Sequence, residues 1–455
     1  MLKQLEEIEN NFAVETIEFK GQKVWPYLRI YIASKLIADA DSKSIDSSVI
    51  KSFFSSFFYG FWNLFKKYEF IYFSSSDQRK KTGKTFTDKS VDSINSILGK
   101  GLVFEYPVPK HYNKKDIPTE NIASKFVLYF LILIHTKIFN RKEKIKNEDV
   151  IKQIIEQYNV PINYREIISR NWAQYQLMQI LIKRFKPKAA FFVCYYTHMG
   201  YIKALNDNGV KVIEIQHGVI NKSHEAYSVF KKIDSSFYPN YIFTFGEVEK
   251  EVFSEKNYFI DNQNVIPVGH FYLDFLANGY SPDIQLKAIT DLYKKSIAIT
   301  SQNHYIEPQL IEFIIETAKL NSSILYVFIP RTLGKKVEEY GFPKNVIIAD
   351  WLNCYEIMAQ TDFHSTVFSS CAIEAPSIGK QNILINLEGL SKMHFGSVLT
   401  NEKVTKFVES PNEYLRCIET FEKQERQYVL DSNKDIITPN YLSKLNETLK
   451  TIIKE

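Results

Sequence analysis

The chain has 455 residues, of which 45% are hydrophobic and 24% are charged, and this balance is typical of globular proteins that bury large cores. It excludes a disordered, collagen-like or coiled-coil protein over most of the length, and 16 glycines and 15 prolines are too few for a long flexible linker. The net charge of +5 is too small to indicate a nucleic-acid-binding protein, although it suits anionic small ligands or an anionic membrane surface.

The first 68 residues read as mostly helical, and we expect them to form an N-terminal extension. The chain starts with MLKQLEEIENNF, which places acidic residues where a signal peptide needs a basic and then an apolar run. The four cysteines show no CxxC pair and no clustered spacing, which is typical of a reducing compartment. We therefore expect a cytoplasmic protein.

Two apolar stretches, residues 49–70 and 126–139, are candidate membrane elements. Neither holds the roughly 18 uninterrupted apolar residues that span a bilayer. In the first stretch, aromatic residues recur at helical spacing and are followed by Lys66 and Lys67. Such a helix either lies in a membrane interface or packs in a core, and both interpretations stay open. In the membrane interpretation, residues 49–70 make peripheral contact with the inner face of the cytoplasmic membrane.

From residue 70 the chain alternates short apolar runs with amphipathic stretches, a pattern that predicts parallel strands and covering helices. The first series lies in an expected domain at 69–277, with helices at 144–159 and 163–185. Its predicted strands are 70–76, 101–106, 189–196, 210–216, 241–246 and 264–269.

A second series follows the polar stretch at 278–283, in an expected domain at 278–438. Its predicted strands are 296–302, 323–330, 345–350, 361–366 and 381–386, and its helices are 307–320, 353–360 and a short one near 370–378. Residues 439–455 are expected to form a docked terminal helix. The fold class predicted is therefore α/β, with two doubly wound Rossmann-like domains that face a central cleft.

In such sheets, ligands bind beyond the carboxyl ends of the strands. Glu214-Ile215-Gln216-His217-Gly218 stands at the end of one predicted strand. An imidazole at a tight turn can accept a proton from an alcohol near neutral pH, or contact a phosphate when it is charged. We predict His217 as the catalytic base, with Glu214 orienting or charging its ring. The alternative that His217 binds the donor phosphate as a cation stays open.

The segment at 361–380 predicts a strand, a hydroxyl-rich loop and a short helix in succession. Hydroxyls and exposed amides at a helix start bind phosphate oxygens without a metal, and a carboxylate one turn into the helix can accept hydrogen bonds from a ribose. The predicted phosphate and ribose residues are Ser365, Thr366, Ser369, Ser370 and Glu374.

Further polar residues follow other predicted strands. On the donor side, Ser301, Gln302 and His304 follow the first strand of the second domain, and Arg331 follows the next. On the acceptor side, the candidates are Ser75, Ser76 and Arg79. The histidines and cysteines show no metal-ligand spacing, so neither a metal nor another cofactor is expected.

The EIQHG segment, the SQNH strand end and the stretch STVFSSCAIEAPSIGKQNILIN resemble GT-B glycosyltransferases that build bacterial capsules and lipopolysaccharide O-chains. The same architecture is shared by the CDP-glycerol glycerophosphotransferases of teichoic acid synthesis, and the resemblance covers roughly residues 70–400. It implies an N-terminal acceptor domain, a C-terminal nucleotide-binding domain and metal-independent catalysis. It also implies that His217 is the histidine of the "HG" segment and that Ser365, Thr366 and Glu374 belong to the donor-binding turn.

Two departures from the family pattern matter. Many relatives have a His-Pro pair where this chain has Ile329-Pro330-Arg331, so His304 or His364 is expected to replace the phosphate-stabilising histidine. The ExxxxxxxE pattern of many retaining members is absent, because Thr366 stands eight residues before Glu374. This absence favours inversion at the anomeric carbon.

The leading hypothesis is transfer of a sugar from a nucleotide-activated donor to a surface glycan or lipid-linked glycan. A CDP-polyol phosphotransferase is the second enzymatic hypothesis. A non-catalytic glycan- or nucleotide-binding partner of an assembly complex is the alternative from another class.

Overall fold

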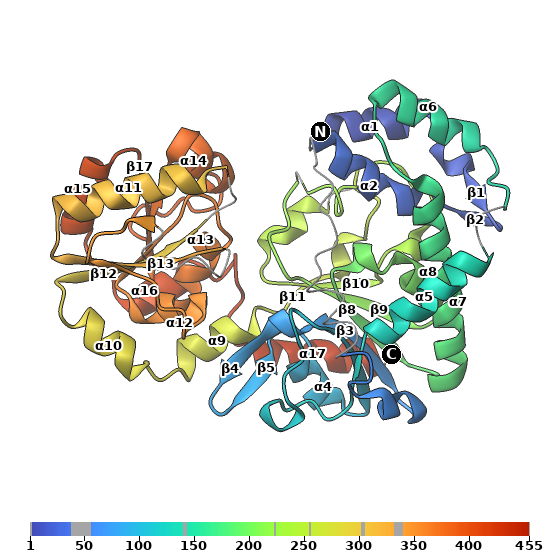
Figure 1. Ribbon diagram of the computed structural model, residues 1–455, viewed down its shortest axis with the longest axis horizontal. Helices are drawn as coiled ribbons and strands as arrows, with labels where there is room; N and C mark the ends of the chain where they lie inside the picture. The colour runs from blue at the N-terminus through green and yellow to red at the C-terminus, as the bar shows by residue number, and fades with distance from the viewer. Residues whose placement is uncertain are drawn as a thin grey trace. The chain divides into compact units, whose positions relative to one another are not determined.

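A computed structural model describes residues 2–37, 56–139, 143–222, 224–253, 256–301, 305–331 and 340–454. Contacts divide the chain into two compact units (Figure 1), one of residues 1–268 with 442–455 and the other of residues 269–441. Each unit is built around one large parallel sheet, which confirms the predicted pair of Rossmann-like domains. The cleft expected between them stays a prediction.

The sheet of the first unit has seven strands in the order β11-β10-β9-β8-β3-β6-β7, and all neighbours are parallel. Most of these strands are buried along almost their whole length, as expected for a parallel sheet covered on both faces. Their bounds are β3 Phe70–Ser75, β6 Gly101–Tyr106, β7 Ile122–Ser124, β8 Ala189–Val193, β9 Lys211–Ile215, β10 Tyr241–Thr244 and β11 Val265–Pro267.

The predicted strands of this unit are confirmed, whereas β7 was not predicted. The predicted helices at 144–159 and 163–185 are α6 and α7. After the N-terminal segment, the helices of the first unit are α4 Asp92–Leu98, α5 Phe126–Phe139, α6 Glu148–Tyr158, α7 Tyr164–Phe185, α8 Met199–Asp207 and α17 Tyr441–Lys454. A hairpin pairs β4 Arg79–Thr82 with β5 Thr85–Asp88.

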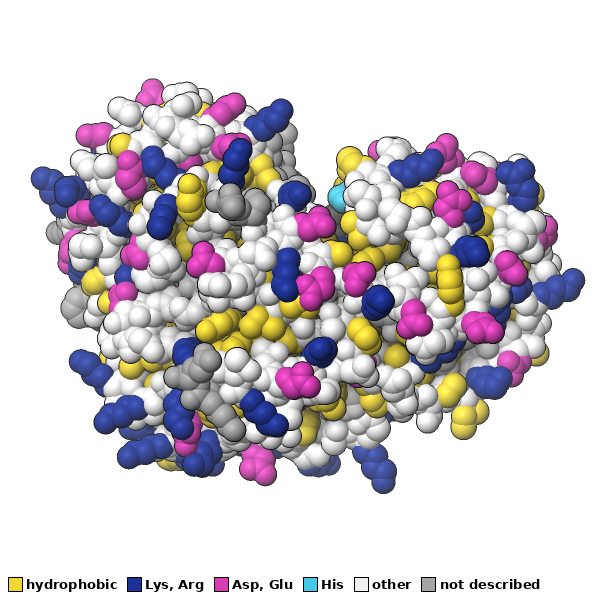
Figure 2. Space-filling model, turned by 180° about the vertical axis from the view of Figure 1, so that it is seen from behind, with side chains coloured by type: hydrophobic (Ala, Val, Ile, Leu, Met, Phe, Trp, Pro, Cys, Tyr) yellow, Lys and Arg dark blue, Asp and Glu magenta, His cyan; other side chains and the backbone are white. Residues whose placement is uncertain are grey.

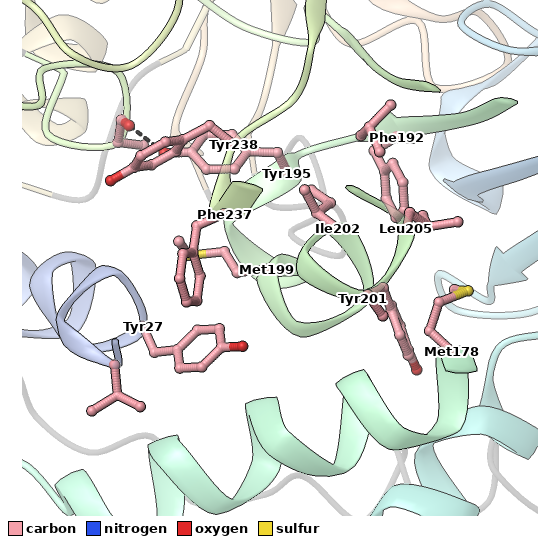
Figure 3. Close-up of a cluster of buried hydrophobic side chains, with 14 of the residues drawn as sticks. Tyr27, Met178, Phe192, Tyr195, Met199, Tyr201, Ile202, Leu205, Phe237 and Tyr238 are labelled. Carbon is pink, nitrogen blue, oxygen red and sulfur yellow. Dashed lines mark hydrogen bonds between the residues drawn. The ribbon is translucent and has the colours of Figure 1, made fainter. Parts of the chain in front are cut away.

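The N-terminal segment is helical, as predicted, and belongs to the core of the first unit. It contains α1 Leu2–Asn11, a small hairpin of β1 Glu18–Phe19 and β2 Gln22–Lys23, and α2 Trp25–Ile37. Tyr27 of α2 points towards Phe237, with ring centroids 4.9 Å apart, in a cluster that also contains residues of α7 and α8 (Figure 3). Packing against the sheet's own helices therefore holds this segment in place.

Residues 49–55 of the predicted aromatic stretch lie outside the described residues. The remainder is not one continuous helix, because turns at residues 57–60 lead into a 3-10 helix, η2 Phe61–Phe65. Gly60 has a positive φ, and a Cβ atom there would lie 1.7 Å from the carbonyl oxygen of Ile122, so only glycine fits this turn. Among the described residues, no helix has the length and apolar character needed to cross a bilayer.

The sheet of the second unit has six parallel strands in the order β14-β13-β12-β15-β16-β17. Numbered along the chain, this is the 3-2-1-4-5-6 order of a dinucleotide-binding sheet, whose direction of winding switches between β12 and β15. The strands are β12 Lys295–Thr300, β13 Ile324–Ile329, β14 Val346–Ile347, β15 Phe363–Ser365, β16 Gln381–Ile385 and β17 Thr405–Val408.

The helices predicted at 307–320, 353–360 and 370–378 are confirmed, the last as α13 followed directly by a 3-10 helix, η10 Ala375–Ile378, whereas the other helices of this unit were not predicted. Asn353 and Glu356 form a reciprocal capping box that starts α12. The helices are α9 Phe271–Asn278, α10 Ile284–Thr290, α11 Glu307–Leu320, α12 Cys354–Gln360, α13 Cys371–Glu374, α14 Leu390–Phe395, α15 Pro411–Thr420 and α16 Arg426–Asp431.

Figure 2 shows that basic and acidic side chains are intermixed on the face that it draws. This agrees with a near balance of 57 basic and 52 acidic residues in the sequence.

Candidate functional site

His217 follows β9 at the carboxyl edge of the first sheet, in a half-buried position. Its Nδ1 atom is buried and has no hydrogen-bond partner among the residues that the structure describes, and its ring lies 6.3 Å from that of Tyr196, centroid to centroid. Burial first, and then the nearby His224 and Lys89, lower the pKa of His217 to about 4. The imidazole is therefore neutral at pH 7, which is the form that can accept a proton.

Glu214 lies on β9, fully buried, and does not contact His217. Its Oε1 accepts hydrogen bonds from the amide of Tyr195 (3.2 Å) and the hydroxyl of Tyr227 (2.8 Å). Glu214 precedes His217 by three positions, and an extended chain points residues three apart to opposite faces. Burial raises the pKa of Glu214 to about 8, so this carboxyl is mostly protonated at pH 7. The predicted role of Glu214 in charging the ring has no contact to support it.

Gln216 holds the turn that presents His217, a role that the sequence analysis missed. Its Nε2 donates to the carbonyl of Gly218 (2.9 Å) and to Oε1 of Glu249 (2.8 Å), and its Oε1 accepts from the amide of Phe245 (2.5 Å). Glu249, on a 3-10 helix at Val248–Val252, is buried, and burial raises its pKa to about 7. The ends of β9 and β10 are thus tied together next to His217.

Lys125 and His198 form a buried pair at the same edge of the sheet, and this pair was not predicted either. Lys125 follows the unpredicted strand β7, and its Nζ contacts Nε2 of His198 in the interior. The other ring nitrogen, Nδ1, lies 2.9 Å from the carbonyl oxygen of Cys194 after β8. Burial lowers the pKa of Lys125 to about 7, so an uncharged amine is a substantial part of its population at neutral pH.

The three predicted acceptor-side residues lie at the end of β3 or shortly after it, and their surroundings differ. Ser75 is half-buried, and its hydroxyl donates to Asp77. Ser76 is buried and accepts from the amide of Val108 (2.6 Å). Arg79 is buried in an ion network, where Nε, Nη1 and Nη2 donate to Glu105 (2.6 Å), Asp92 (3.1 Å) and Thr119 (3.1 Å). All three of its guanidinium nitrogens therefore bind protein groups, which is against the predicted contact of Arg79 with an acceptor.

In the second unit, Thr366 joins the two strands at the switch point of the sheet. Its hydroxyl donates to the carbonyl of Thr300 at the end of β12 (2.9 Å), and its side chain is fully buried. Ser301, the next residue after β12, donates to Glu307 at the start of α11 (2.5 Å). The loops that follow β12 and β15 thus start side by side, as they do where nucleotides bind in such sheets.

Ser369 and Ser370 are half-buried in the loop after β15, immediately before α13. The hydroxyl of Ser369 accepts from the amide of Cys371 at 3.4 Å, a long and weak hydrogen bond. Glu374, at the end of α13, is buried, and its Oε1 accepts from the hydroxyl of Tyr355 at 3.2 Å. Of the predicted hydroxyls, those of Ser369 and Ser370 are the most accessible.

His364 and Ser365 lie on β15 inside the sheet. His364 is fully buried between Thr300 (3.0 Å from Nε2) and Asn382 (2.8 Å from Nδ1), and burial lowers its pKa to about 4. The hydroxyl of Ser365 lies 2.6 Å from that of Tyr414 on α15. Both side chains therefore form hydrogen bonds inside the second unit, and their burial is against the predicted direct contact with a donor phosphate.

Arg331 is exposed after β13, whereas Gln302 and His304 lie outside the described residues. The same edge carries an aromatic stack that was not predicted: Tyr305, Phe368 and His394. The rings of Tyr305 and Phe368 are nearly parallel with centroids 6.2 Å apart, and those of Phe368 and His394 are 5.1 Å apart. Tyr305 is 61% exposed, so this stack reaches the surface of the second unit.

Within the described ranges, no group of three or more His, Cys, Asp or Glu residues is arranged to hold a metal ion.

No protein-family model and no curated protein sequence matches this chain. Solved structures do resemble it. The calicheamicin glycosyltransferase CalG4 has 12% identity and a TM-score of 0.50, over 86% of this chain and 99% of its own. UDP-GlcNAc 2-epimerase from Neisseria meningitidis, bound to UDP-GlcNAc, has 13% identity and a TM-score of 0.50, over 85% and 99%. The UDP-GlcNAc 2-epimerase of Methanocaldococcus jannaschii has 11% identity, the same TM-score and the same coverage.

At these identities the likeness shows the fold alone. Together with the two parallel sheets, it establishes that this chain has the GT-B fold, with a helical segment added at its N-terminus.

Proposed function

We propose that this protein is a metal-independent, inverting glycosyltransferase that uses a nucleotide-activated sugar. The observation that carries the proposal is the hydroxyl-lined switch point of the second sheet, where Thr366 joins β15 to β12 and Ser369 and Ser370 follow. Crevices of this kind bind nucleotides in doubly wound sheets, and hydroxyls with free amides suit diphosphate oxygens.

The second unit binds the donor. Ser369 and Ser370 donate to the diphosphate, and Arg331, which is exposed after β13, adds a positive charge. The exposed face of Tyr305 stacks on a ring of the donor. Gln302, His304 and Glu374 are also proposed to contact the donor. Glu374 is buried, with a hydrogen bond from Tyr355.

The first unit supplies the base. The acceptor hydroxyl oxygen attacks the anomeric carbon, the bond from that carbon to the phosphate oxygen breaks, and the nucleoside diphosphate leaves with the electron pair. The acceptor proton passes to an imidazole nitrogen of His217. With a pKa lowered to about 4, His217 is neutral at pH 7, which is the form that accepts a proton; the cationic role would require the bound phosphate to raise that pKa.

The acceptor proposed is a bacterial surface polysaccharide, of the capsule or O-chain type, or its lipid-linked precursor. This part of the proposal rests on the EIQHG and STVFSSC segments. An epimerase acting on the nucleotide sugar itself, and a phosphotransferase acting on a CDP-polyol, have the same donor-side requirements. The experiment must therefore separate the three reactions.

The test begins with the purified chain and a panel of CMP, CDP, UDP and GDP with their sugars and polyols. A nucleotide that binds raises the melting temperature by mass action. The donors that bind are then incubated without acceptor, and the products are followed by nuclear magnetic resonance. Slow release of nucleoside diphosphate and free sugar supports a glycosyltransferase, whereas a changed sugar configuration with the nucleotide still attached identifies an epimerase. Release of CMP from a CDP-polyol identifies a phosphotransferase, and no binding to any nucleotide overturns the proposal.

A further inference from the structure

Eight large apolar side chains of the first unit are exposed on three neighbouring segments. Phe58, Trp62 and Phe65, around η2, are 73%, 79% and 59% exposed. Most soluble proteins bury such rings, because each offers a large apolar area. The other members are Phe130, Leu131, Leu133 and Ile134 on α5 and Ile180 on α7. We call these eight residues the apolar surface.

Ring contacts join the first two segments of the apolar surface. Phe57, next to Phe58, packs edge-on against Phe130 of α5 with centroids 5.6 Å apart. A chain of further ring contacts runs through the turn to its end, where Trp62 and Phe65 lie 5.9 Å apart. The η2 segment and α5 therefore form one patch.

Arg184 joins the third segment to the patch. Its Nε donates to the carbonyl of Leu64 (2.9 Å), and its guanidinium lies 5.6 Å from the ring of Phe65. Ile180 precedes Arg184 by four residues on α7, so the two side chains share one face of that helix. Helices α5 and α7 pack on each other, as Figure 1 shows.

The core does not account for the apolar residues of α5. Leu128 and Ile132 already face the interior of the first unit and are almost fully buried. A helix on the surface of a soluble protein normally turns a polar face outwards, yet residues 130, 131, 133 and 134 are all apolar. With 14 residues, α5 is about 21 Å long, too short to cross a hydrocarbon core of about 30 Å.

Basic side chains border the apolar surface, and Glu69, which follows the η2 segment, is paired with two lysines. Residues 56–68 and 126–139 contain no aspartate or glutamate. Lys66 and Lys67 are exposed directly after η2, and Lys183 and Arg184 are exposed at the end of α7. Aromatic and aliphatic side chains bordered by lysine and arginine match the interface of an anionic bilayer, where rings enter the headgroup region and cations meet lipid phosphates.

We propose that the apolar surface binds the interface of an anionic lipid bilayer, with η2 and α5 lying in the membrane plane. The inference does not depend on the proposed function, because it concerns a different part of the first unit from the edge that carries His217. Both apolar burial and phosphate attraction contribute, so binding requires anionic lipid and weakens with salt.

The first experiment is co-sedimentation of the full chain with vesicles of phosphatidylcholine alone or mixed with phosphatidylglycerol. We expect sedimentation with the mixed vesicles and little with phosphatidylcholine. The double variant Trp62→Glu/Leu133→Glu should bind at least about tenfold more weakly, since two charges enter the apolar region. Lys66→Gln should weaken binding about fivefold, from the loss of one cation near the surface.

The matched control is Ile284→Glu/Leu292→Glu, which places the same charges at two residues of the second unit that are 86% and 80% exposed. It should sediment like the wild type. All variants change exposed residues, so unchanged melting temperatures are expected and must be verified. Wild-type tryptophan fluorescence should shift to the blue with anionic vesicles, and Trp62→Phe should lose most of that shift.

Three outcomes overturn the proposal. One is a wild type that does not sediment with anionic vesicles, and another is a control variant that loses binding as strongly as the apolar-surface variant. The third is a wild-type dimer in sedimentation velocity that Trp62→Glu/Leu133→Glu dissociates, without vesicle binding by either protein, because the surface would then pair with a second copy of the chain.

Discussion

Nε of Arg29 lies 2.9 Å from Oε1 of Glu9, and both side chains are only 1% exposed. The same guanidinium donates to the carbonyls of Glu225 (2.7 Å) and Ser228 (2.6 Å), in the long loop that follows His217. Trp25 also donates to Glu9 (2.9 Å). This buried ion pair thus anchors the loop after β9 to the helical N-terminal segment.

Replacing Arg29 with methionine should lower the free energy of unfolding by about 3–5 kcal/mol, because Glu9 is left buried without its cation. Urea denaturation followed by circular dichroism measures the change. The control is Lys231→Met, which removes a partly exposed pair with Glu15 (2.6 Å) and should cost less than about 1 kcal/mol. Equal losses in the two variants would contradict the anchoring role of Arg29.

Ser369→Ala and Ser370→Ala should each weaken nucleotide binding by about 1 kcal/mol, the contribution of one lost hydrogen bond. Isothermal titration calorimetry with the nucleotide found in the binding panel measures this. Ser365→Ala is the matched control, because its hydroxyl lies inside the sheet against Tyr414. It should reduce stability and leave the affinity unchanged. If Ser365→Ala alone weakened binding, the phosphates would lie elsewhere.

His217→Ala should fold and bind donor normally while transfer slows by about 100- to 10,000-fold, the usual contribution of a general base. Because the pKa of His217 is lowered to about 4, the base is already neutral at mildly acidic pH. The wild-type rate should therefore stay level through neutral pH and fall only as the pH drops towards about 4. Steady-state rates across pH test this.

His224→Ala is the control for that experiment, since His224 lies as far from Tyr196 as His217 does, with ring centroids 6.3 Å apart in both cases. It should change transfer only slightly. Weaker donor binding by His217→Ala, together with a wild-type rate that falls as pH rises, would instead assign His217 to the phosphate as a cation.

Glu214 should make the protein less stable as the pH rises. Burial raises its pKa to about 8 in the folded state, above the value of about 4.3 in an unfolded chain. Its contribution to stability is therefore fully present below the unfolded pKa and is lost as the pH rises through about 8. Compared with the wild type, Glu214→Gln should gain relative stability between pH 5 and pH 8.5, measured by urea unfolding.

The control for that measurement is Glu409→Gln. The side-chain hydrogen bond from Lys392 lowers the pKa of exposed Glu409, so its ionised form is the one favoured in the folded state. This substitution should not produce a relative gain of stability at high pH. If the stability of the wild type and that of Glu214→Gln changed with pH in the same way, folding would not raise the pKa of Glu214, which would contradict this prediction.

Transfer should persist in the presence of EDTA, because the donor diphosphate is held by hydroxyls, amides and Arg331 in the proposed site. The measurement is the transfer rate after dialysis against the chelator, with and without added magnesium. Loss of the rate and its recovery with magnesium would contradict this account of the donor phosphates.

The main strands could be predicted from sequence, because parallel strands are buried on both faces and read as continuous apolar runs. Residues 70–75, 189–193 and 324–329 are examples. Strands β7 and β17 were missed, because neither Ile122–Ser124 nor Thr405–Val408 is a continuous apolar run. The position of His217 after a strand was visible for the same reason, since a strand's end marks the edge where ligands bind.

The sequence alone therefore determined the two-sheet architecture and the loops worth inspecting, since apolar periodicity depends on local burial. Only the tertiary structure decided which side chains in those loops are accessible. In the folded protein, the side chains of His364 and Ser365 are buried in the sheet. Arg79 forms ion pairs with Glu105 and Asp92. The tertiary structure also brought Tyr305, Phe368 and His394 together from three separate segments. These outcomes depend on contacts between residues far apart in the chain, and burial by those contacts also sets the pKa values of His217 and Glu214.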